Sequence, residues 1–486
     1  MNKVKRDVVS GVFWKFSERM AAQIVSLIVS IVLARLLSPS EYGTISLVNV
    51  FITIANVFVT SGFAAALIQK KDADDIDYSS VFYFTLVFSG CVYSLLFILA
   101  LPVAQFYQMP ILKPVLRVLS LSIIILGINS IQQAYVSREM IFKKFFYATL
   151  IGTLISAVVG ILMAYHGFGV WALVAQTLTN NIIDTIVLQC TIDWRPIKAF
   201  SFKRIKSLLN YGWKLLAQSL ILQIYSSLRS LVIGKIYTTS DLAYYTKGNQ
   251  FPDLICSNID TAINSALFPA MAKEQDSLER VKIMARRTTR ISSYIMNPVL
   301  VGFMAVAEPF ISLLLTDKWL PAVPYLRICC IILLFRAPQT AMLQAIKAVG
   351  RSDSVLKVDF PIRIFALAVL IISVRYGVIY FALSEILTTI FGTILYAKAA
   401  KKIIGYSGRE LCSDFIVNII LAGIMGIIVW EIGKILKISN LFLIVIQCCA
   451  GGVIYVFLSI ITKSESFYYV INMGKEILKI KGEKIG

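Results

Sequence analysis

The chain has 486 residues, of which 58% are hydrophobic and only 15% are charged. Ordinary soluble domains carry about a quarter charged residues, so this composition excludes an ordinary soluble domain and indicates a membrane protein. The formal net charge of +20 raises the question of a nucleic-acid partner.

The apolar residues fall in blocks of about 20 to 26, the length that an α-helix needs to cross a hydrocarbon core of roughly 30 Å. They predict an all-α polytopic membrane protein with about fourteen transmembrane helices. In chain order these spans are 10–34, 42–66, 79–106, 112–136, 145–166, 168–191, 209–234, 243–271, 289–315, 322–346, 355–374, 376–397, 412–433 and 440–462. The longest connections are 192–208 and 272–288, and the loop from Lys273 to Thr288 is expected to form a short surface helix. No soluble catalytic domain is therefore expected.

The positions of Lys and Arg explain the net charge. One set of alternate connections, together with both termini, holds 31 of these residues, whereas the other set holds 7. The positive-inside rule then places both termini in the cytoplasm. Membrane lipids with anionic headgroups are the expected partners of the basic loops, and no nucleic-acid partner is predicted. Glu18 and Arg19 interrupt the first apolar run, so we expect no cleaved signal peptide there.

The residue types that carry most enzyme chemistry are sparse. The eight cysteines form no CxxC pair and His166 is the only histidine, so neither a metal site nor a disulfide framework is predicted. No residues have the spacing of a nucleophilic triad or of a glycine loop that cradles phosphate. The sequence therefore predicts no catalytic residues, no metal and no cofactor.

The stretch from Val12 to Gly43 returns 199 or 200 positions later. Trp14-Lys15 recurs as Trp213-Lys214, and Ser40-Glu41 recurs as Ser240-Asp241. Two copies with an even number of spans form a parallel repeat, and ligands tend to bind between such copies. The predicted domains are an N-terminal six-helix bundle (1–191), a cytoplasmic amphipathic linker (192–208), a C-terminal six-helix bundle (209–402), and two extra transmembrane helices with a basic cytoplasmic tail (403–486).

Polar residues recur every three or four positions on the first two helices of each copy, which puts them on one helical face. In hydrocarbon, each unsatisfied polar group costs several kcal/mol, so these faces must meet protein or water. They predict either a wet cavity or interhelical hydrogen bonds, and the charged members favour the cavity. Between the first two helices, Pro39 sets φ and Ser40 is expected to cap the second helix.

Several carboxylates lie within the later apolar blocks. Asp184 is either a coupling carboxylate or a hydrogen-bonded contact between helices. Asp359 and Arg363 are four apart and are expected to pair on one helical face. If the predicted cavity serves transport, H⁺ or Na⁺ could drive it, or it could run downhill, and the sequence leaves this open. The residues predicted for ion coupling are Asp253, Asp260, Asp359 and Glu385.

The motif LARLLSPSEYGTISL at 33–47, its counterpart IGKIYTTSDLAYYTKGNQF at 233–251 and ALFPAMAKEQ at 266–275 carry a family resemblance. They resemble the polysaccharide transporter branch of the multidrug/oligosaccharidyl-lipid/polysaccharide exporter superfamily, whose members are called Wzx-type flippases. Within that branch the chain looks most like the teichuronic acid and colanic acid exporters. The resemblance extends over nearly the whole chain.

The resemblance implies a V-shaped pair of six-helix bundles that works by alternating access. The implied cargo is an oligosaccharide linked to undecaprenyl-pyrophosphate, which crosses the bacterial plasma membrane for lipopolysaccharide, O-antigen or capsule synthesis. Polymerases and glycosyltransferases are the implied partners. Arginines on the first helix matter in related exporters, and Arg19 lies in an equivalent stretch.

Site residues follow from the polar faces and the implied cargo together. A pyrophosphate is a concentrated anion, and cations that face a low-dielectric cavity attract it strongly. The predicted pyrophosphate ligands are Lys15, Arg19, Lys214 and Arg229. The predicted contacts to the glycan hydroxyls are Asn49, Asn56, Gln218, Asn249 and Asn264.

Other function classes are weighed against the flippase. A cation-coupled multidrug antiporter of the same superfamily would favour an acidic, aromatic-lined cavity, whereas the first-half face is basic. A membrane glycosyltransferase or polymerase would need a catalytic side chain on a sizeable outer loop, and every predicted outer loop is short. A purely structural scaffold would not explain matching polar faces in both halves. The sequence therefore predicts a flippase that is not an enzyme.

Overall fold

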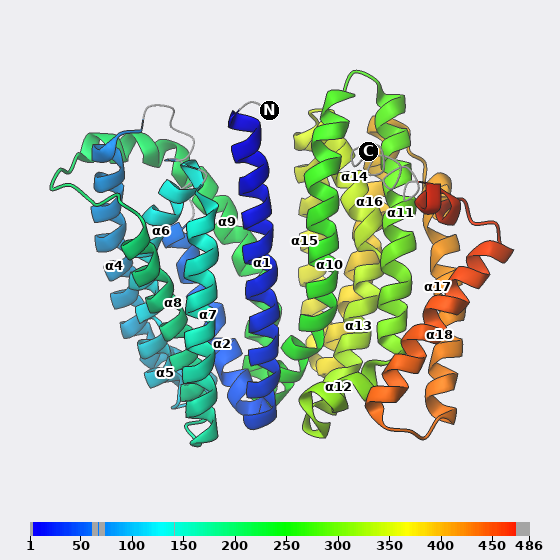
Figure 1. The fold of residues 1–486 in the computed structure, drawn as a ribbon, viewed down its shortest axis with the longest axis horizontal. Helices are drawn as coiled ribbons and strands as arrows, with labels where there is room; N and C mark the ends of the chain where they lie inside the picture. Colours follow the sequence, from blue (N-terminus) through cyan, green and yellow to red (C-terminus); the bar gives the residue numbers. More distant parts are fainter. Residues whose placement is uncertain (1–2, 61–66, 68–72, 140, 473–486) are drawn as a thin grey trace, which may run out of the picture. The chain divides into compact units, whose positions relative to one another are not determined.

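The computed structural model describes residues 3–60, 67, 73–139 and 141–472. Every regular element within those ranges is a helix, as Figure 1 shows, so the prediction of an all-α protein is confirmed. The chain forms two compact units, Met1–Ala243 and Tyr244–Gly486. These units follow from packing, whereas the predicted boundaries at 191, 208 and 402 follow from the sequence repeat and the extra spans. The predicted division by repeat stays a prediction.

The first unit contains the helices of the first sequence copy and the first helix of the second copy. Its helices are α1 (Lys3–Leu36), α2 (Pro39–Thr60), α4 (Asp75–Tyr107), α5 (Leu112–Leu119), α6 (Leu121–Arg138), α7 (Phe142–Tyr165), α8 (Val170–Thr191) and α9 (Phe202–Ile236). Helix α9 packs against α2 and α4. The Tyr107 hydroxyl donates to the Leu231 carbonyl at 3.3 Å, and Lys235 donates to the carbonyl of Phe106. These contacts are why the first compact unit extends to Ala243.

The predicted amphipathic linker at 192–208 has two parts in the structure. Residues 192–201 contain no helix, and residues 202–208 form the first turns of α9. The non-helical part is anchored to the start of α4, because the Ile197 and Ser201 amides each donate at 2.9 Å, to the hydroxyls of Ser79 and Ser80 respectively. The indole N–H of Trp194 donates to Asp75 at 3.2 Å. Residues 192–201, called the strap below, are therefore fixed to the start of α4.

Most of the second unit is also helical. Helix α10 (Thr239–Lys273) begins at the end of the first unit, and it is followed by α11 (Leu278–Ala305), α12 (Ala307–Leu315), the 3₁₀ helix η1 (Asp317–Ala322), α13 (Val323–Leu334), α14 (Arg336–Ala348), α15 (Ser352–Ser373), the 3₁₀ helix η2 (Val374–Tyr376), α16 (Val378–Ile404), α17 (Gly408–Ile435) and α18 (Asn440–Ile461). Helices α17 and α18, orange to red in Figure 1, pack against each other, and α17 packs against α11.

Two predicted spans of this unit are broken. The span predicted at 322–346 is interrupted at Phe335, and the one at 289–315 bends by 70° between α11 and α12 at Val306. Each break lies three residues before a proline, Pro338 and Pro309. Proline lacks an amide donor and its ring clashes with the carbonyl four residues earlier, so a helix ends or kinks there.

The expectation of a short surface helix from Lys273 to Thr288 is wrong. The connection between α10 and α11 contains only residues 274–277, and α11 continues from Leu278 as one helix. Ser277 starts α11 by accepting a hydrogen bond from the amide of Arg280, which satisfies one of the free donors of the first turn.

Ten helices of the described chain are long and apolar enough to cross a membrane, or up to eleven if the bent pair counts as one span. The protein is therefore a multi-pass membrane protein. The spans predicted at 168–191, 243–271 and 355–374 correspond to α8, α10 and α15, which are helices outside that set. Fourteen spans stay a prediction.

Candidate functional site

The turn that opens α2 has a matching turn at the start of α10. The Ser38 hydroxyl and amide donate to the Glu41 carboxylate at 2.8 and 2.7 Å. The Thr238 hydroxyl and amide donate to Asp241 in the same way, at 2.7 and 3.1 Å. Ser38 is thus the capping residue, and the expectation for Ser40 is wrong because Ser40 lies inside the first helical turn. Both copies close their turn with one hydroxyl and one carboxylate three residues later.

The two turns touch each other within the first unit. The hydroxyl oxygens of Ser40 and Thr239 are 2.9 Å apart. Gly43 packs on the same residue so closely that a Cβ at this position would lie 1.8 Å from the Thr239 carbonyl oxygen. Only glycine permits this approach. The contact fixes the start of α10 on the start of α2.

Helix α1 is held by an aromatic contact on one side and exposes Arg19 on another. The Trp14 ring packs edge-on to Phe146 of α7, with centroids 5.4 Å apart, and the Lys143 ammonium lies 5.5 Å from the Trp14 ring centre. Arg19 is five residues further on, about 140° around the helix, and its side chain is exposed. The side chains of Lys15 and Lys214 lie outside the described part of the structure.

Polar residues of α2 and α9 are also exposed. Asn49 of α2 and Gln218 of α9 are exposed, and Arg229 of α9 is half-buried. The Thr53 hydroxyl donates at 2.6 Å to the Asn49 carbonyl of its own helix, so it does not link α2 to a neighbour. Asn56 is half-buried, and its side-chain oxygen accepts no hydrogen bond among the described residues. These positions fit a hydrated face better than interhelical hydrogen bonding.

The polar face of α10 is different, because two of its residues bridge to α14. Asp260 is 6% exposed and its carboxylate lies 2.6 Å from Nε of Arg336. Four residues on, Asn264 accepts a hydrogen bond from Gln344 at 2.9 Å. Asp253 of the same helix is exposed, and the carbonyl of half-buried Asn249 accepts a 3.9 Å hydrogen bond from Cys329 of α13. In the C-terminal half of α10, this face therefore makes contacts between helices, at Asp260 and Asn264.

The remaining predicted coupling carboxylates each have a partner in the second unit. Asp359 lies 3.9 Å from Arg363, which confirms the pairing on one face of α15. The Tyr396 hydroxyl of α16 also donates to Asp359 at 2.5 Å. Glu385 of α16 accepts a hydrogen bond from Tyr245 at 3.3 Å. These partners orient the carboxylates.

Asp184 links helices of the first unit. Its carboxylate accepts a 2.7 Å hydrogen bond from the Asn129 amide, so a hydrogen bond joins α6 and α8. The Asn129 side chain is buried. Of the two alternatives left open by the sequence, the structure contains the contact between helices.

Sequence reasoning missed the partners of Asp260, Asn264 and Asp359. Arg336, Gln344 and Tyr396 lie 37 to 80 positions from the residues they contact. Arg336 stands out as a charge in an apolar block and was the one signal available. Gln344 and Tyr396 carry none, because neither is unusual at its position. The assignment of all predicted site residues to pyrophosphate, glycan or coupling ion stays a prediction.

Comparison with known proteins gives the family. A family model described as "Polysaccharide biosynthesis protein" matches residues 32–324. The chain is 23% identical to the lipopolysaccharide biosynthesis protein WzxC of Escherichia coli, over 89% of each chain. It is 21% identical to the teichuronic acid biosynthesis protein TuaB of Bacillus subtilis, over 94% of this chain and 96% of that protein. The succinoglycan biosynthesis transport protein ExoT of Rhizobium meliloti is 23% identical over 71% of this chain and 70% of its own.

Solved structures share the fold. The lipid II flippase MurJ in an inward closed conformation superposes with a TM-score of 0.76 at 15% identity, covering 93% of this chain and 98% of MurJ. An inward-facing multidrug resistance MATE transporter of the MOP superfamily superposes with a TM-score of 0.61 at 15% identity, covering 79% and 94%. The predicted exporter fold is therefore confirmed. Because the family model matches more than half of its length, the chain belongs to the polysaccharide biosynthesis protein family.

Proposed function

We propose that this protein is a flippase for undecaprenyl-pyrophosphate-linked oligosaccharide repeat units. It carries them from the inner to the outer leaflet of the bacterial plasma membrane by alternating access, for surface polysaccharide synthesis. Both of its termini are cytoplasmic, which the excess of Lys and Arg in one set of connections supports. Glycosyltransferases that complete the repeat unit and a polymerase that consumes it are the expected partners.

One observation carries this proposal: apolar spans of the first unit expose polar side chains. Arg19 is exposed at the start of the span Arg19–Leu36, and Gln218 is exposed in the span Leu215–Ile236. Asn49 is exposed in the middle of Pro39–Thr60. Such groups are costly against lipid tails, so they mark a hydrated path through the membrane. A polar headgroup on a lipid anchor is the kind of cargo that needs such a path while its chain stays in the bilayer.

The residue types fit the two parts of that headgroup. Lys15, Arg19, Lys214 and Arg229 are assigned to the pyrophosphate, since guanidinium and ammonium groups bind phosphate oxygens by charge-assisted hydrogen bonds. The amides assigned to the sugar hydroxyls both donate and accept, as hydroxyl recognition requires; they are Asn49, Asn56, Gln218, Asn249 and Asn264.

Transport of this kind breaks no covalent bond, so the protein is proposed to act without enzymatic chemistry. An H⁺ or Na⁺ gradient would act through the second-unit carboxylates, of which Asp253 is exposed and Asp260, Asp359 and Glu385 have partners. Collapse of each gradient by an ionophore distinguishes coupled transport from downhill transport.

The direct test measures the leaflet in which the lipid-linked sugar accumulates. Deletion of the gene should trap the oligosaccharide lipid in the inner leaflet of spheroplasts, where an external glycosidase or lectin cannot reach it. Arg19→Ala and Arg229→Ala should each reproduce most of that defect at normal protein levels. Arg19→Lys should retain partial export, because it keeps the charge and loses the planar fork.

Lys437→Ala is the matched control, since Lys437 is an exposed cation in the short connection between α17 and α18. Export at the wild-type rate by both arginine variants would contradict the anion site. Normal outer-leaflet display in the deletion strain would contradict the flippase function itself.

A further inference from the structure

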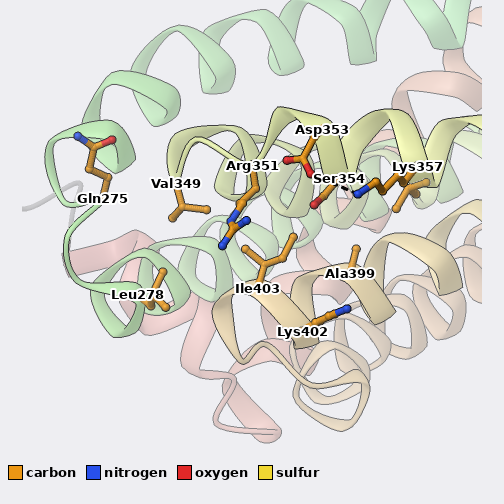
Figure 2. A pocket seen from close by; sticks show the side chains of 11 residues that line it. Gln275, Leu278, Val349, Arg351, Asp353, Ser354, Lys357, Ala399, Lys402 and Ile403 are labelled. Atoms are coloured by element: carbon orange, nitrogen blue, oxygen red, sulfur yellow. Dashed lines mark ion pairs between the residues drawn. The ribbon is translucent and has the colours of Figure 1, made fainter.

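A cavity of about 580 Å³ lies at one end of the second unit. Three segments line it, as Figure 2 shows: the connection between α10 and α11, the turn from α14 into α15, and the last turns of α16. In that view Arg351 stands between Val349 and Ile403, and Lys402 lies below them on α16. Nothing in the proposed transport mechanism uses this cavity.

The charges around the cavity are unbalanced. Arg351, Lys357 and Lys402 contribute three cations, and Asp353 is the single carboxylate among the lining residues. Asp353 is already paired with Lys357 at 3.5 Å. Neither Arg351 nor Lys402 has an ion-pair partner within the described ranges of the chain. The cavity therefore holds two uncompensated positive charges.

The turn that presents Arg351 is well defined. Gly350 has a φ of +74°, which glycine adopts without strain, and its amide donates to the Lys347 carbonyl at 3.0 Å. The amide of Arg351 then donates to the Ile346 carbonyl at 3.2 Å. These two bonds close the end of α14 immediately before α15 begins. The guanidinium is thus carried by a short, hydrogen-bonded turn.

Most of the other lining residues are apolar, and Gln275 and Ser354 are the polar exceptions. Leu278, Val358 and Ile403 line the cavity together with the cations. On the neighbouring face of α15, Leu356 and Phe360 are 69% and 66% exposed, which in a multi-pass membrane protein is a surface for lipid. A soluble anion would gain nothing from such walls, whereas a phospholipid places its phosphate beside the start of its acyl chains.

We propose that this cavity binds the phosphate-bearing headgroup of an anionic phospholipid, with Arg351 and Lys402 as its ligands. Basic pockets between helices at the cytoplasmic side recognise such headgroups through charge, and nearby apolar side chains cover the glycerol and first methylenes. The site is separate from every residue assigned to the cargo, so it does not depend on what the protein transports.

The test uses the full-length protein in detergent and native mass spectrometry with phosphatidylglycerol as the probe. Wild-type protein should retain phosphatidylglycerol in preference to phosphatidylcholine. Arg351→Gln combined with Lys402→Gln should lower the apparent affinity for phosphatidylglycerol about tenfold or more. The conservative pair Arg351→Lys with Lys402→Arg should retain most of it.

The matched control is Lys347→Gln with Arg409→Gln, which removes the same charge from two exposed residues that do not line the cavity. If this control lost as much affinity as Arg351→Gln with Lys402→Gln, the loss would reflect the overall surface charge and not the cavity. That result would overturn the proposal. Displacement of phosphatidylglycerol by inorganic phosphate at equal concentration would also overturn it, because the site would then belong to a soluble anion.

A second measurement needs no variant. A photoreactive phosphatidylglycerol analogue should label peptides that contain residues 349–358 and 399–403 of the wild-type protein, and excess phosphatidylglycerol should suppress the labelling. Labelling confined to other peptides would overturn the assignment even if the glutamine variants failed to fold.

Discussion

The hydroxyl oxygens of Ser40 and Thr239 lie 2.9 Å apart although the two residues are 199 positions apart in the chain. They belong to the equivalent turns of the two sequence copies, each of which closes with a hydroxyl–carboxylate cap. The internal repeat therefore has a structural counterpart: one copy's turn packs on the other's. Gly43 permits this contact, because any larger residue would meet the Thr239 backbone.

Replacement of Gly43 by alanine should destabilise the protein. The added Cβ would lie 1.8 Å from the Thr239 carbonyl oxygen, so the two turns would have to separate. Overpacking of this kind costs about 1–3 kcal/mol. We expect a lower midpoint of thermal unfolding in detergent, together with a loss of export.

Gly90→Ala serves as the control for this change. Gly90 lies inside α4 of the same unit and has open space around its Cβ position. Alanine in a helix interior is favoured over glycine by about 0.5–1 kcal/mol, so this variant should be neutral or slightly more stable. Equal melting temperatures for the Gly43 and Gly90 variants would show that the two turns do not pack as described.

Replacement of Asp414 by alanine should detach α17 from α11. The Asp414 side chain is fully buried and lies 2.8 Å from Nε of Arg286, and Arg290 contacts its second oxygen. The Tyr406 hydroxyl donates to it at 3.0 Å. Removal of one partner of a buried ion pair costs about 3–5 kcal/mol, and the loss here should lie at the low end because both arginines keep a second carboxylate partner. Chemical denaturation in micelles should report a loss of that order.

Glu431→Ala is the comparison for Asp414. Glu431 pairs with Lys434 at 2.8 Å, but both side chains are 50% exposed. Exposed pairs contribute about 0–1 kcal/mol, so this variant should unfold almost like the wild type. A loss at Asp414 no larger than that at Glu431 would mean that the Asp414 cluster does not hold α17.

The start of α9, which directly follows the strap at 192–201, should loosen in acid. The pKa of Asp74 is lowered below its ordinary value because its carboxylate accepts hydrogen bonds from Arg204 and from the Asp77 amide. A carboxyl group with a lowered folded-state pKa contributes stability above its unfolded pKa of about 3.9, and this is lost as the pH falls through the folded value. Hydrogen exchange of residues 193–204, corrected for intrinsic rates, should rise below about pH 4.

Asp74→Asn should show the faster exchange already at neutral pH and lose the dependence on acid. Asp193→Asn is the control, because its carboxylate is fully exposed and lies 3.9 Å from Lys144. If Asp74→Asn exchanged like the wild type at pH 7, the Arg204 contact would not anchor the start of α9.

Replacement of Asp260 by asparagine should weaken the link between α10 and α14. The variant leaves Arg336 without its carboxylate partner, at a cost of about 1–3 kcal/mol. The double variant Asp260→Asn/Arg336→Gln should recover part of this loss. A double variant no more stable than the single one would show that the two residues are not energetically coupled.

Comparison of the single variant Asp260→Asn with the double variant Asp260→Asn/Arg336→Gln separates an effect on stability from an effect on transport. If Asp260 carries a coupling ion, export should stay defective in the double variant even where stability returns. Asp253→Asn is the control for stability, since Asp253 is exposed and surface changes usually stay within about 0.5 kcal/mol.

Much of the helix content followed from the sequence alone. Apolar blocks of membrane-spanning length predict helices in lipid, because backbone groups there must pair within their own segment. The repeat located both hydroxyl–carboxylate turns, although it pointed to Ser40 where Ser38 is the cap. Helical spacing also placed Asp359 and Arg363 on one face.

The tertiary structure decided which side chains meet. The 3.6-residue period fixes only the face of its own helix on which a residue lies. The partner of Asp260 comes from α14, 76 positions away, and that of Asp184 from α6, 55 positions away. Packing also assigned α9 to the first unit, although the repeat assigns it to the second copy. Neither result follows from local spacing, because contacts between helices depend on side chains of both partners.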